Sequence, residues 1–377
     1  MPRSLRIVIA GGGTGGHVHP ALAVLQLLRR DMDVEPLWIG SRDGIERSVA
    51  NENDIPFREV QTGKLRRYFS LQTPVDALRI PFGTAQSFKI LRRFRPDVIF
   101  STGGFVSVPT VISGRLLRIP AITHEQTATV GLATKINARF ADVVALSFER
   151  SRQQLGRIKA HVIVTGNPVR ASLFNGNAAA GRDHFSLPHD LPMLYVTGGA
   201  LGAQAINLAV RDALPELLRR AVILHQCGPT DANGDLPILE SARKDLPVEL
   251  QSRYAIRERI GTELADVYAA AALVIGRAGA GTVAELAALG KPSLLIPLPG
   301  TGGDEQTLNA RVLSQAGASV LLPQDQLTAA RLIQEIETLL APGTLETMAN
   351  AARQIGGTDA AERLASAILE LARHKSE

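Results

Sequence analysis

Two histidines that follow a glycine-rich turn are the first residues whose chemistry points to a function. They lie in the stretch from Ile9 to Val24, IAGGGTGGHVHPALAV, between an apolar run and an expected helix. An imidazole titrates near neutral pH, so either ring could act as a base or bind phosphate. His17 follows the glycines directly and is the candidate functional residue. His19, two residues on, points in another direction, and we expect it to be structural.

Carboxylates are the second group that could do acid–base chemistry. Glu125 lies in the sequence HEQ, directly after an expected strand, where it could act as a base or orient a substrate hydroxyl. The alternative is that it caps the start of the next helix. Asp31-Met32-Asp33 has the D-x-D spacing of a metal-binding motif. It falls between a helix and the next strand, and we expect it on the solvated surface.

Three glycine-rich loops follow expected strands and predict phosphate binding. They are residues 11–16, 101–109 and 196–207. Glycine allows a tight turn and leaves the N–H groups of a helix start facing an anion. One such loop is equally compatible with turn geometry alone. Three of them, in corresponding positions of two domains, favour a pair of pyrophosphates, one on a nucleotide donor and one on an acceptor.

Residues around these loops exclude two common nucleotide-binding classes. A dinucleotide site needs an acidic residue at the end of the second strand, and this strand ends in Gly40 and Ser41. The phosphate-binding motif G-x-x-x-x-G-K-[ST] is absent. In the second half, residues 276–286 place Glu285 one turn into a helix, where it could bind vicinal ribose hydroxyls. Residues 297–310 add polar groups at another strand end.

The elements that position these residues alternate between apolar strands and amphipathic helices. We expect strands at 5–9, 37–39, 98–101, 121–123, 143–146, 162–165, 193–197, 222–225, 273–275, 293–296 and 319–321. Expected helices include 20–28, 203–214, 282–289 and 306–316. This alternation is typical of parallel sheets covered on both faces, whose ligands bind beyond the carboxyl ends of the strands.

Length and composition indicate a two-domain globular protein with anionic partners. A chain of 377 residues is too long for one ordinary core. We expect domains at 1–165 and 191–345, a linker at 166–190, and a helical tail at 346–377 that could pack back on the N-terminal domain. The net charge of +5 favours phosphates, nucleic acid or anionic lipid. No signal peptide or membrane-spanning run is expected, and the single Cys227 fits a reducing cytosol as a packed apolar residue.

Seven motifs occur in order along nearly the whole chain. They are GGGTGGHVHPALAV at 11–24, GKLRRY at 63–68, TGGFVSVP at 102–109, HEQ at 124–126, GNPVR at 166–170, RAGAGTVAEL at 277–286 and DEQTLNA at 304–310. In these motifs the chain resembles the MurG family, bacterial transferases of glycosyltransferase family 28. The resemblance implies an α/β fold of the GT-B type, in which two doubly wound Rossmann-like domains face a cleft.

The resemblance also implies an activity. It is the inverting transfer of N-acetylglucosamine from UDP-N-acetylglucosamine to the C4 hydroxyl of undecaprenyl-pyrophosphoryl-MurNAc-pentapeptide, the step from lipid I to lipid II in peptidoglycan synthesis. The N-terminal domain would hold the acceptor and the C-terminal domain the donor, with no cofactor and no metal. His17 is the first choice for the base that deprotonates the acceptor hydroxyl, and Glu125 is the second.

Binding residues follow from the same resemblance, position by position. The donor would contact Thr14, Gly15, Gly16, Thr127, Arg170, Ala200, Gly261, Ala280, Gly281, Thr282, Val283, Glu285 and Gln306. The acceptor pyrophosphate would contact Gly13, Gly103, Gly104 and Ser107. Arg170 would face the donor diphosphate, Gly261 the uracil edge, and Glu285 the ribose hydroxyls.

A lipid-linked acceptor requires access to a membrane surface. The stretch 64–96 mixes basic and apolar side chains, namely Arg66, Arg67, Arg92, Arg93 and Arg95 with Leu65, Phe69, Ile80, Phe82, Ile90 and Phe94. This composition fits docking on anionic lipid, and fits a surface helix with a buried stripe nearly as well. The implied location is cytoplasmic, peripheral on the inner face of the cell membrane, with no nucleic-acid partner.

Some positions depart from the family pattern. Thr127 replaces the usual Asn, Ala200 and Leu201 replace Ser and Gln, Phe105 replaces Tyr, and Glu305 replaces His or Gln. Several of these changes remove groups that would contact or position the donor. Two alternatives therefore stay open. One is a related transferase with another UDP-sugar or acceptor, and the other is a UDP-sugar-binding protein or 2-epimerase of the same architecture.

Overall fold

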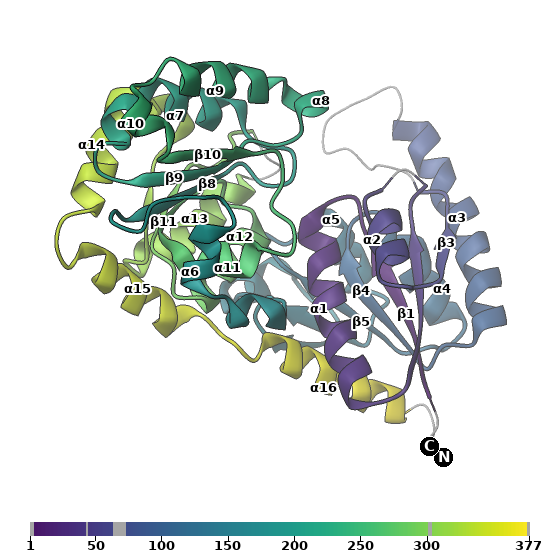
Figure 1. Ribbon diagram of the computed structural model, residues 1–377. Helices are drawn as coiled ribbons and strands as arrows, with labels where there is room; N and C mark the ends of the chain where they lie inside the picture. The colour runs from purple at the N-terminus through teal and green to yellow at the C-terminus, as the bar shows by residue number, and fades with distance from the viewer. Residues whose placement is uncertain (1–3, 43, 63–72, 301–303, 375–377) are drawn as a thin grey trace. The chain divides into compact units, whose positions relative to one another are not determined.

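A computed structural model describes residues 4–42, 44–62, 73–300 and 304–374, without the side chains of 73–79 and 374. The chain divides into two compact units (Figure 1). Unit 1 comprises residues 1–170 and 358–377, and unit 2 comprises residues 171–357. The expected linker at 166–190 therefore divides between the units at residue 170. The expected tail also divides, because its last helix belongs to unit 1.

Unit 1 is built on a parallel sheet of seven strands in the order β3-β2-β1-β4-β5-β6-β7. The strands are β1 (Leu5–Gly11), β2 (Val34–Gly40), β3 (Phe57–Glu59), β4 (Val98–Gly103), β5 (Ala121–Glu125), β6 (Val143–Leu146) and β7 (His161–Val164). Its helices are α1 (Gly15–Asp31), α2 (Glu46–Glu52), α3 (Thr73–Phe94), α4 (Ser107–Leu116), α5 (Leu132–Asn137), the 3₁₀ helix η1 (Glu149–Gln154) and α16 (Ala360–His374).

Alternate residues of β1 enter two different cores, which is why both faces of the sheet carry helices. Ile7 and Ile9 pack with α1 and α16 on one face, while Val8 and Ala10 pack with α3 and α4 on the other. Side chains of a strand alternate between faces, so a strand buried on both sides is apolar throughout. Residues Leu364, Ala365, Ile368 and Ala372 form the apolar stripe by which α16 joins unit 1.

Unit 2 repeats the plan with six parallel strands in the order β10-β9-β8-β11-β12-β13. The strands are β8 (Met193–Thr197), β9 (Val222–Gln226), β10 (Tyr254–Arg257), β11 (Ala271–Gly276), β12 (Ser293–Leu295) and β13 (Ser319–Leu321). The helices are η2 (Ala171–Asn175), α6 (Ala178–Asp183), α7 (Gln204–Leu217), α8 (Thr230–Asn233), α9 (Asp235–Lys244), α10 (Val248–Gln251), α11 (Leu264–Ala270), α12 (Ala280–Ala288), α13 (Glu305–Gln315), η3 (Gln324–Gln326), α14 (Ala329–Leu339) and α15 (Thr344–Ile355).

Several expectations can be compared with these elements directly. Every expected strand is present, whereas β3 and β10 were not predicted; both are short and lie at a sheet edge. Asp31 is exposed and pairs with Arg30 at 2.8 Å, which confirms its place on the surface. Cys227 is buried, as expected. Within the residues that the structure describes, no helix combines the length and hydropathy needed to cross a membrane.

Candidate active site

Parallel strand order brings the candidate residues of each unit to one edge of its sheet. In unit 1, the loops after β1, β4 and β5 are neighbours because these strands are adjacent. In unit 2, the candidate residues follow β10, β8, β11 and β12, which share one sheet. The carboxyl ends of parallel strands all lie at the same edge, which is where ligands bind in such folds.

His17 lies in the first turn of α1, and hydrogen bonds fix its ring. Nδ1 lies 2.7 Å from the carbonyl oxygen of Thr102 and 3.0 Å from Oε1 of Gln126. A carbonyl oxygen only accepts, so Nδ1 must carry the proton. In the neutral ring Nε2 then keeps its lone pair, which is the state a general base requires.

Glu125, the second candidate base, has both carboxylate oxygens engaged within the chain. Oε1 accepts from the Thr127 N–H at 3.2 Å and from the Thr127 hydroxyl at 2.9 Å, while Oε2 accepts from the Gly131 N–H at 2.9 Å. Its side chain is buried. This arrangement closes the loop before α5, where Gly131 is the N-cap. It also uses the Thr127 hydroxyl that was expected at the donor.

A buried carboxylate that sequence reasoning missed organises the first glycine loop. Glu46, the first residue of α2, is fully buried. Its oxygens accept from the Gly13 N–H at 2.8 Å and from both the N–H and the hydroxyl of Ser41, at 2.8 and 2.7 Å. A Cβ on Gly12 would lie 2.1 Å from Glu46 Cδ. The loop therefore already binds the Glu46 side chain. The Gly13 N–H, which we expected to contact the acceptor pyrophosphate, donates to this side chain instead.

The glycines after β4 leave room for the first loop and for the His17 ring. A Cβ on Gly104 would lie 2.6 Å from the carbonyl oxygen of Gly12, and one on Gly103 would lie 3.3 Å from the His17 ring. Both glycines have positive φ, 89° at Gly103 and 75° at Gly104. Ser107 is buried, and its hydroxyl donates to the Gly104 carbonyl at 2.8 Å. These contacts position the first loop and the His17 ring.

The remaining candidates of unit 1 lie around the start of α1 and at the end of the unit. Thr14 is the exposed N-cap of α1, and its carbonyl accepts from the His17 N–H at 3.1 Å. Gly15 and Gly16 are half-buried in the first turn. Arg170 is the last residue of the first segment of unit 1 and lies within electrostatic reach of His19.

In unit 2, Glu285 is oriented by an aromatic pair beneath it. The Tyr268 hydroxyl donates to Glu285 Oε2 at 2.8 Å. The Tyr268 ring meets the Tyr195 ring edge-on, with 5.7 Å between centroids, and the Tyr195 hydroxyl donates to Gln226 at 2.9 Å. A carboxylate is an acceptor group of the kind that can bind the vicinal hydroxyls of a ribose. Tyr268 is a second residue that sequence reasoning missed.

The start of α12 is the candidate diphosphate site. Ala280, Gly281 and Thr282 form its first turn, where N–H groups and the helix dipole favour an anion. No atom lies within 4 Å of a Cβ built on Gly281. Val283 does not fit a contact role, because its side chain is buried and its N–H donates to the Gly279 carbonyl at 3.0 Å.

Gln306, in the first turn of α13, joins two loops of the same edge. Its Oε1 accepts from the Ala278 N–H at 3.3 Å and from the Leu298 N–H at 3.0 Å. Asn309, one turn on, donates to the Ala278 carbonyl at 3.2 Å. The side chains of Gln306 and Asn309 thus fix the loop that begins α12. The N–H groups of Ala278 and Leu298 bond to the side-chain oxygen of Gln306 and not to its NH₂ group.

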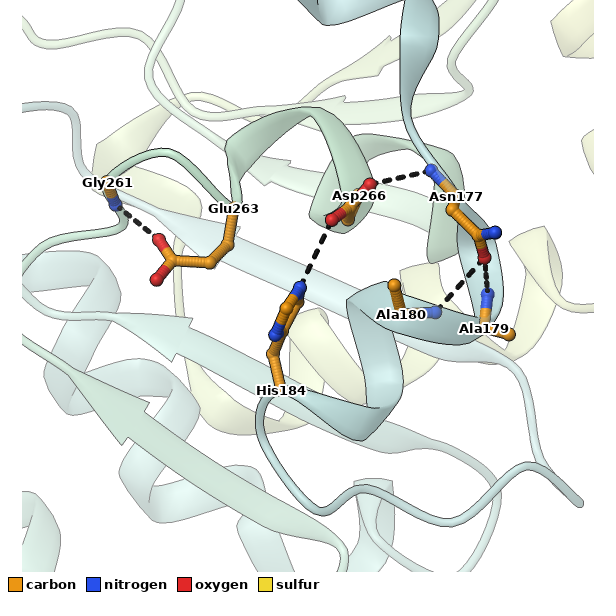
Figure 2. A network of polar contacts seen from close by, with 7 residues as sticks. All are labelled: Asn177, Ala179, Ala180, His184, Gly261, Glu263 and Asp266. Atoms are coloured by element: carbon orange, nitrogen blue, oxygen red, sulfur yellow. Dashed lines mark hydrogen bonds and ion pairs between the residues drawn. The ribbon is translucent and has the colours of Figure 1, made fainter.

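Two further donor candidates lie on loops at this edge. Ala200 is exposed after β8, next to Leu201, whose side chain is 69% exposed. The Gly261 N–H donates to Glu263 Oε2 at 3.2 Å (Figure 2). Any uracil contact through this N–H would therefore compete with a carboxylate of the chain itself.

Figure 2 also shows why residues 171–190 belong to unit 2. Asp266 of α11 accepts from the Asn177 N–H at 2.7 Å and contacts Nε2 of His184 at 3.1 Å. Asn177 in turn caps α6 through the N–H groups of Ala179 and Ala180. These donors lower the pKa of the Asp266 carboxyl. The segment expected to be a linker is thus bonded to α11.

Comparisons with known proteins agree with this arrangement. Residues 7–146 match the glycosyltransferase family 28 N-terminal domain, and residues 193–372 match the family 28 C-terminal domain. A relative from Treponema denticola is 38% identical over 330 residues, covering 85% of this chain and 84% of its own length. It is named UDP-N-acetylglucosamine--N-acetylmuramyl-(pentapeptide) pyrophosphoryl-undecaprenol N-acetylglucosamine transferase.

Solved structures extend the comparison to the fold. The crystal structure of Acinetobacter baumannii MurG covers 97% of this chain and 99% of its own, with 27% identity and a TM-score of 0.75. A UDP-GlcNAc 2-epimerase from Neisseria meningitidis, solved with UDP-GlcNAc, matches 98% of this chain and all of its own at 16% identity, with a TM-score of 0.67. At that identity the epimerase shares the fold alone. The fold is thus the two-domain GT-B architecture.

Proposed function

Because the chain belongs to glycosyltransferase family 28, we propose that it transfers N-acetylglucosamine from UDP-N-acetylglucosamine to the C4 hydroxyl of undecaprenyl-pyrophosphoryl-MurNAc-pentapeptide. The product is lipid II, the lipid-linked disaccharide of peptidoglycan synthesis. Relatives that carry this activity in their names match the chain over most of its length. The observation that carries the chemistry is the His17 ring, whose Nδ1 proton is held so that Nε2 can accept another.

The reaction proceeds by one displacement with inversion. His17 Nε2 takes the proton of the acceptor C4 hydroxyl as its oxygen attacks C1 of the α-linked donor. The bond from C1 to the UDP oxygen breaks, and the β-linked disaccharide forms. We assign the base to His17 rather than Glu125, because both Glu125 oxygens already accept hydrogen bonds from their own loop.

Unit 2 supplies the donor site in this proposal. Glu285, held by Tyr268, binds the ribose hydroxyls, and the first turn of α12 faces the diphosphate. These N–H groups stabilise the negative charge that develops on the leaving UDP. Gln306 contacts the sugar while its oxygen holds the loops. No step requires a metal or an organic cofactor.

Unit 1 supplies the acceptor site and a surface for its lipid. Helices α3 and α4 pack together and expose two large apolar side chains, Phe82 at 67% and Leu116 at 65%. Basic side chains are exposed on and beside the same helices, namely Lys89, Arg92, Arg93, Arg95, Arg115 and Arg118. Apolar and basic groups together favour anionic lipid. Leu65, Arg66, Arg67 and Phe69 lie outside the described residues. We place the protein at the cytoplasmic face of the membrane.

The test is UDP release from UDP-N-acetylglucosamine with and without a soluble lipid I analogue. We expect release that depends on the acceptor and a disaccharide product that is β-linked. Donor binding without release would point to another acceptor or to a binding protein. Conversion of the donor sugar to its 2-epimer without acceptor would show that the protein is an epimerase of the same fold and not a transferase.

A further inference from the structure

Four residues of unit 1 form a chain of hydrogen bonds that runs from the His17 ring into the protein. His17 Nδ1 lies 3.0 Å from Gln126 Oε1, Gln126 Nε2 lies 3.1 Å from His124 Nδ1, and His124 Nε2 lies 2.9 Å from the Gly166 carbonyl oxygen. Gln126 and His124 are both buried. The bond between Gln126 and His124, in the middle of this chain, is therefore shielded from water.

The partners of each atom determine the direction of every bond. Gln126 Nε2 lies 2.8 Å from the Thr102 carbonyl and 3.2 Å from the His124 carbonyl, so this end must be the NH₂ group. Oε1 then faces His17 and accepts from Nδ1–H. His124 Nδ1 accepts from the NH₂ group, so the His124 proton is on Nε2, which donates to Gly166. All three bonds point away from His17.

The buried state of His124 keeps this direction constant. Burial lowers the pKa of His124 to about 4, so the ring is neutral near pH 7. A charged ring would carry protons on both nitrogens and would set Nδ1–H against the Gln126 NH₂ group.

The chain ends at a constrained point of the backbone. Gly166 has a φ of 83°, and a Cβ there would lie 3.2 Å from Cβ of Ala360, the first residue of α16. The glycine therefore accommodates both the turn and the contact with α16. The boundary between the units follows at residue 170.

We propose that Gln126 is the positioning residue of His17, and that His124 holds Gln126 in place with Nδ1, while the bond to the Gly166 carbonyl fixes the His124 proton on Nε2. The inference rests on the proposed role of His17 as the base. Thr102 alone could keep a proton on Nδ1, but two acceptors set both the tautomer and the rotation of the ring. The two ring nitrogens are distinct, and the bond made by one decides what the other can do.

The first experiment reads the His17 tautomer in long-range ¹H–¹⁵N spectra of protein with ¹⁵N-labelled histidine. The His17 signals are assigned by their loss in His17→Ala. We expect Nδ1–H in the natural protein, and a tautomer ratio shifted about fivefold toward Nε2–H in Gln126→Met, because one of two hydrogen bonds is lost. Ser113→Ala is the matched control, since it removes a 2.8 Å bond from a buried side chain to the Thr84 carbonyl in the same unit. An unchanged tautomer in Gln126→Met would overturn the inference.

The second experiment separates the two ends of His124. The Asn amide reaches the position of Nδ1, so His124→Asn keeps an acceptor for Gln126 and loses the bond to Gly166. The Gln amide reaches the position of Nε2, so His124→Gln keeps the bond to Gly166 and loses the acceptor. We expect kcat to fall about tenfold in Gln126→Met and His124→Gln, and much less in His124→Asn, with an unchanged KM for the donor. A larger loss of kcat in His124→Asn than in His124→Gln, or a change in KM alone, would overturn the inference.

These experiments distinguish a failure of the inference from a failure of the proposed function. If the natural protein shows no acceptor-dependent UDP release, the proposed function fails, while the tautomer spectra still test whether Gln126 positions His17. If Gln126→Met does not fold, His124→Asn and His124→Gln give the same comparison from the other side of the bond.

Discussion

Glycine-rich loops follow strands in both units, but the space around their glycines differs. In unit 1 the chain itself fills the space beside Gly12 and Gly104, although Gly13 is open. A Cβ would lie 2.1 Å from Glu46 at Gly12 and 2.6 Å from a backbone oxygen at Gly104. In unit 2, a Cβ on Gly198 or Gly202 would also be crowded by backbone atoms, whereas one on Gly199 or Gly281 would meet no atom within 4 Å beyond its chain neighbours and its own helix backbone. The crowded glycines Gly12 and Gly104 allow elements to approach and position His17, whereas Gly199 and Gly281 leave open surface at a strand end and a helix start.

The largest effect on activity is expected from substitution of His17, the side chain that the glycine-rich loops of unit 1 position. His17→Ala should lower kcat by about 10²–10⁴-fold, because it removes the proposed base. UDP release with the lipid I analogue measures this. His19→Ala is the matched control, since His19 is exposed and lies two residues on. We expect it to retain most of the activity, and equal losses in the two variants would contradict the assignment.

Filling the crowded loop should cost stability. Gly12→Ala places a methyl group against the buried Glu46 carboxylate, and we expect the free energy of unfolding to fall by about 3 kcal/mol. Denaturant unfolding measures the change. In the Glu46→Ala background the same substitution should cost much less, because the carboxylate that it meets is gone. Additive effects of the two changes would show that Glu46 does not crowd the loop.

Each unit also buries a neutral histidine, which predicts acid sensitivity in both. Burial lowers the pKa of His124 to about 4 and that of His225 to about 3. Between these values and the ordinary value of about 6.5, the unfolded chain binds protons that the folded protein does not. The free energy of unfolding should therefore fall as the pH drops below 6.5, by up to about 1.4 kcal/mol per pH unit for each ring.

Denaturant unfolding between pH 7 and pH 4.5 measures that slope. His225→Phe removes one of the two rings together with its bonds to Tyr254 and Asn207. We expect this variant to be less stable at pH 7 and to show a shallower slope. A slope equal to that of the natural protein would mean that His225 does not contribute.

The smallest effect is expected at an open glycine. Gly281→Ala should leave the free energy of unfolding unchanged or raise it by up to about 1 kcal/mol, since Ala favours a helix over Gly. Its methyl group would stand where the donor diphosphate approaches, so UDP binding should weaken about tenfold. Calorimetry with UDP measures this. Tight UDP binding in Gly281→Ala would remove the distinction between the two kinds of glycine.

Several features of the fold follow from local properties of the sequence. The β-branched runs, the helical periodicity and the glycines after strands were sufficient to locate most strands along the chain and to place His17 at a carboxyl edge. The strand β3 was not predicted because Phe57–Glu59 is short, only partly buried and carries charged residues, and β10 was not predicted because its four residues, YAIR, include a single β-branched side chain. The boundary at residue 170 was not predicted for another reason. The segment that leads into α6 is bonded to Asp266 of unit 2, which lies far along the chain.

The sequence by itself determined that this protein is a two-domain parallel α/β glycosyltransferase of family 28 type, because repeating patterns and ordered motifs are properties of the linear chain. Only the tertiary structure decided which polar groups meet. Glu46 enters a loop 33 residues away, and Gln126 reaches His17 across 109 residues. The physical reason is that a parallel sheet gathers the carboxyl ends of adjacent strands, so partners far apart in sequence become neighbours and decide which hydrogen-bonding groups a substrate can still use.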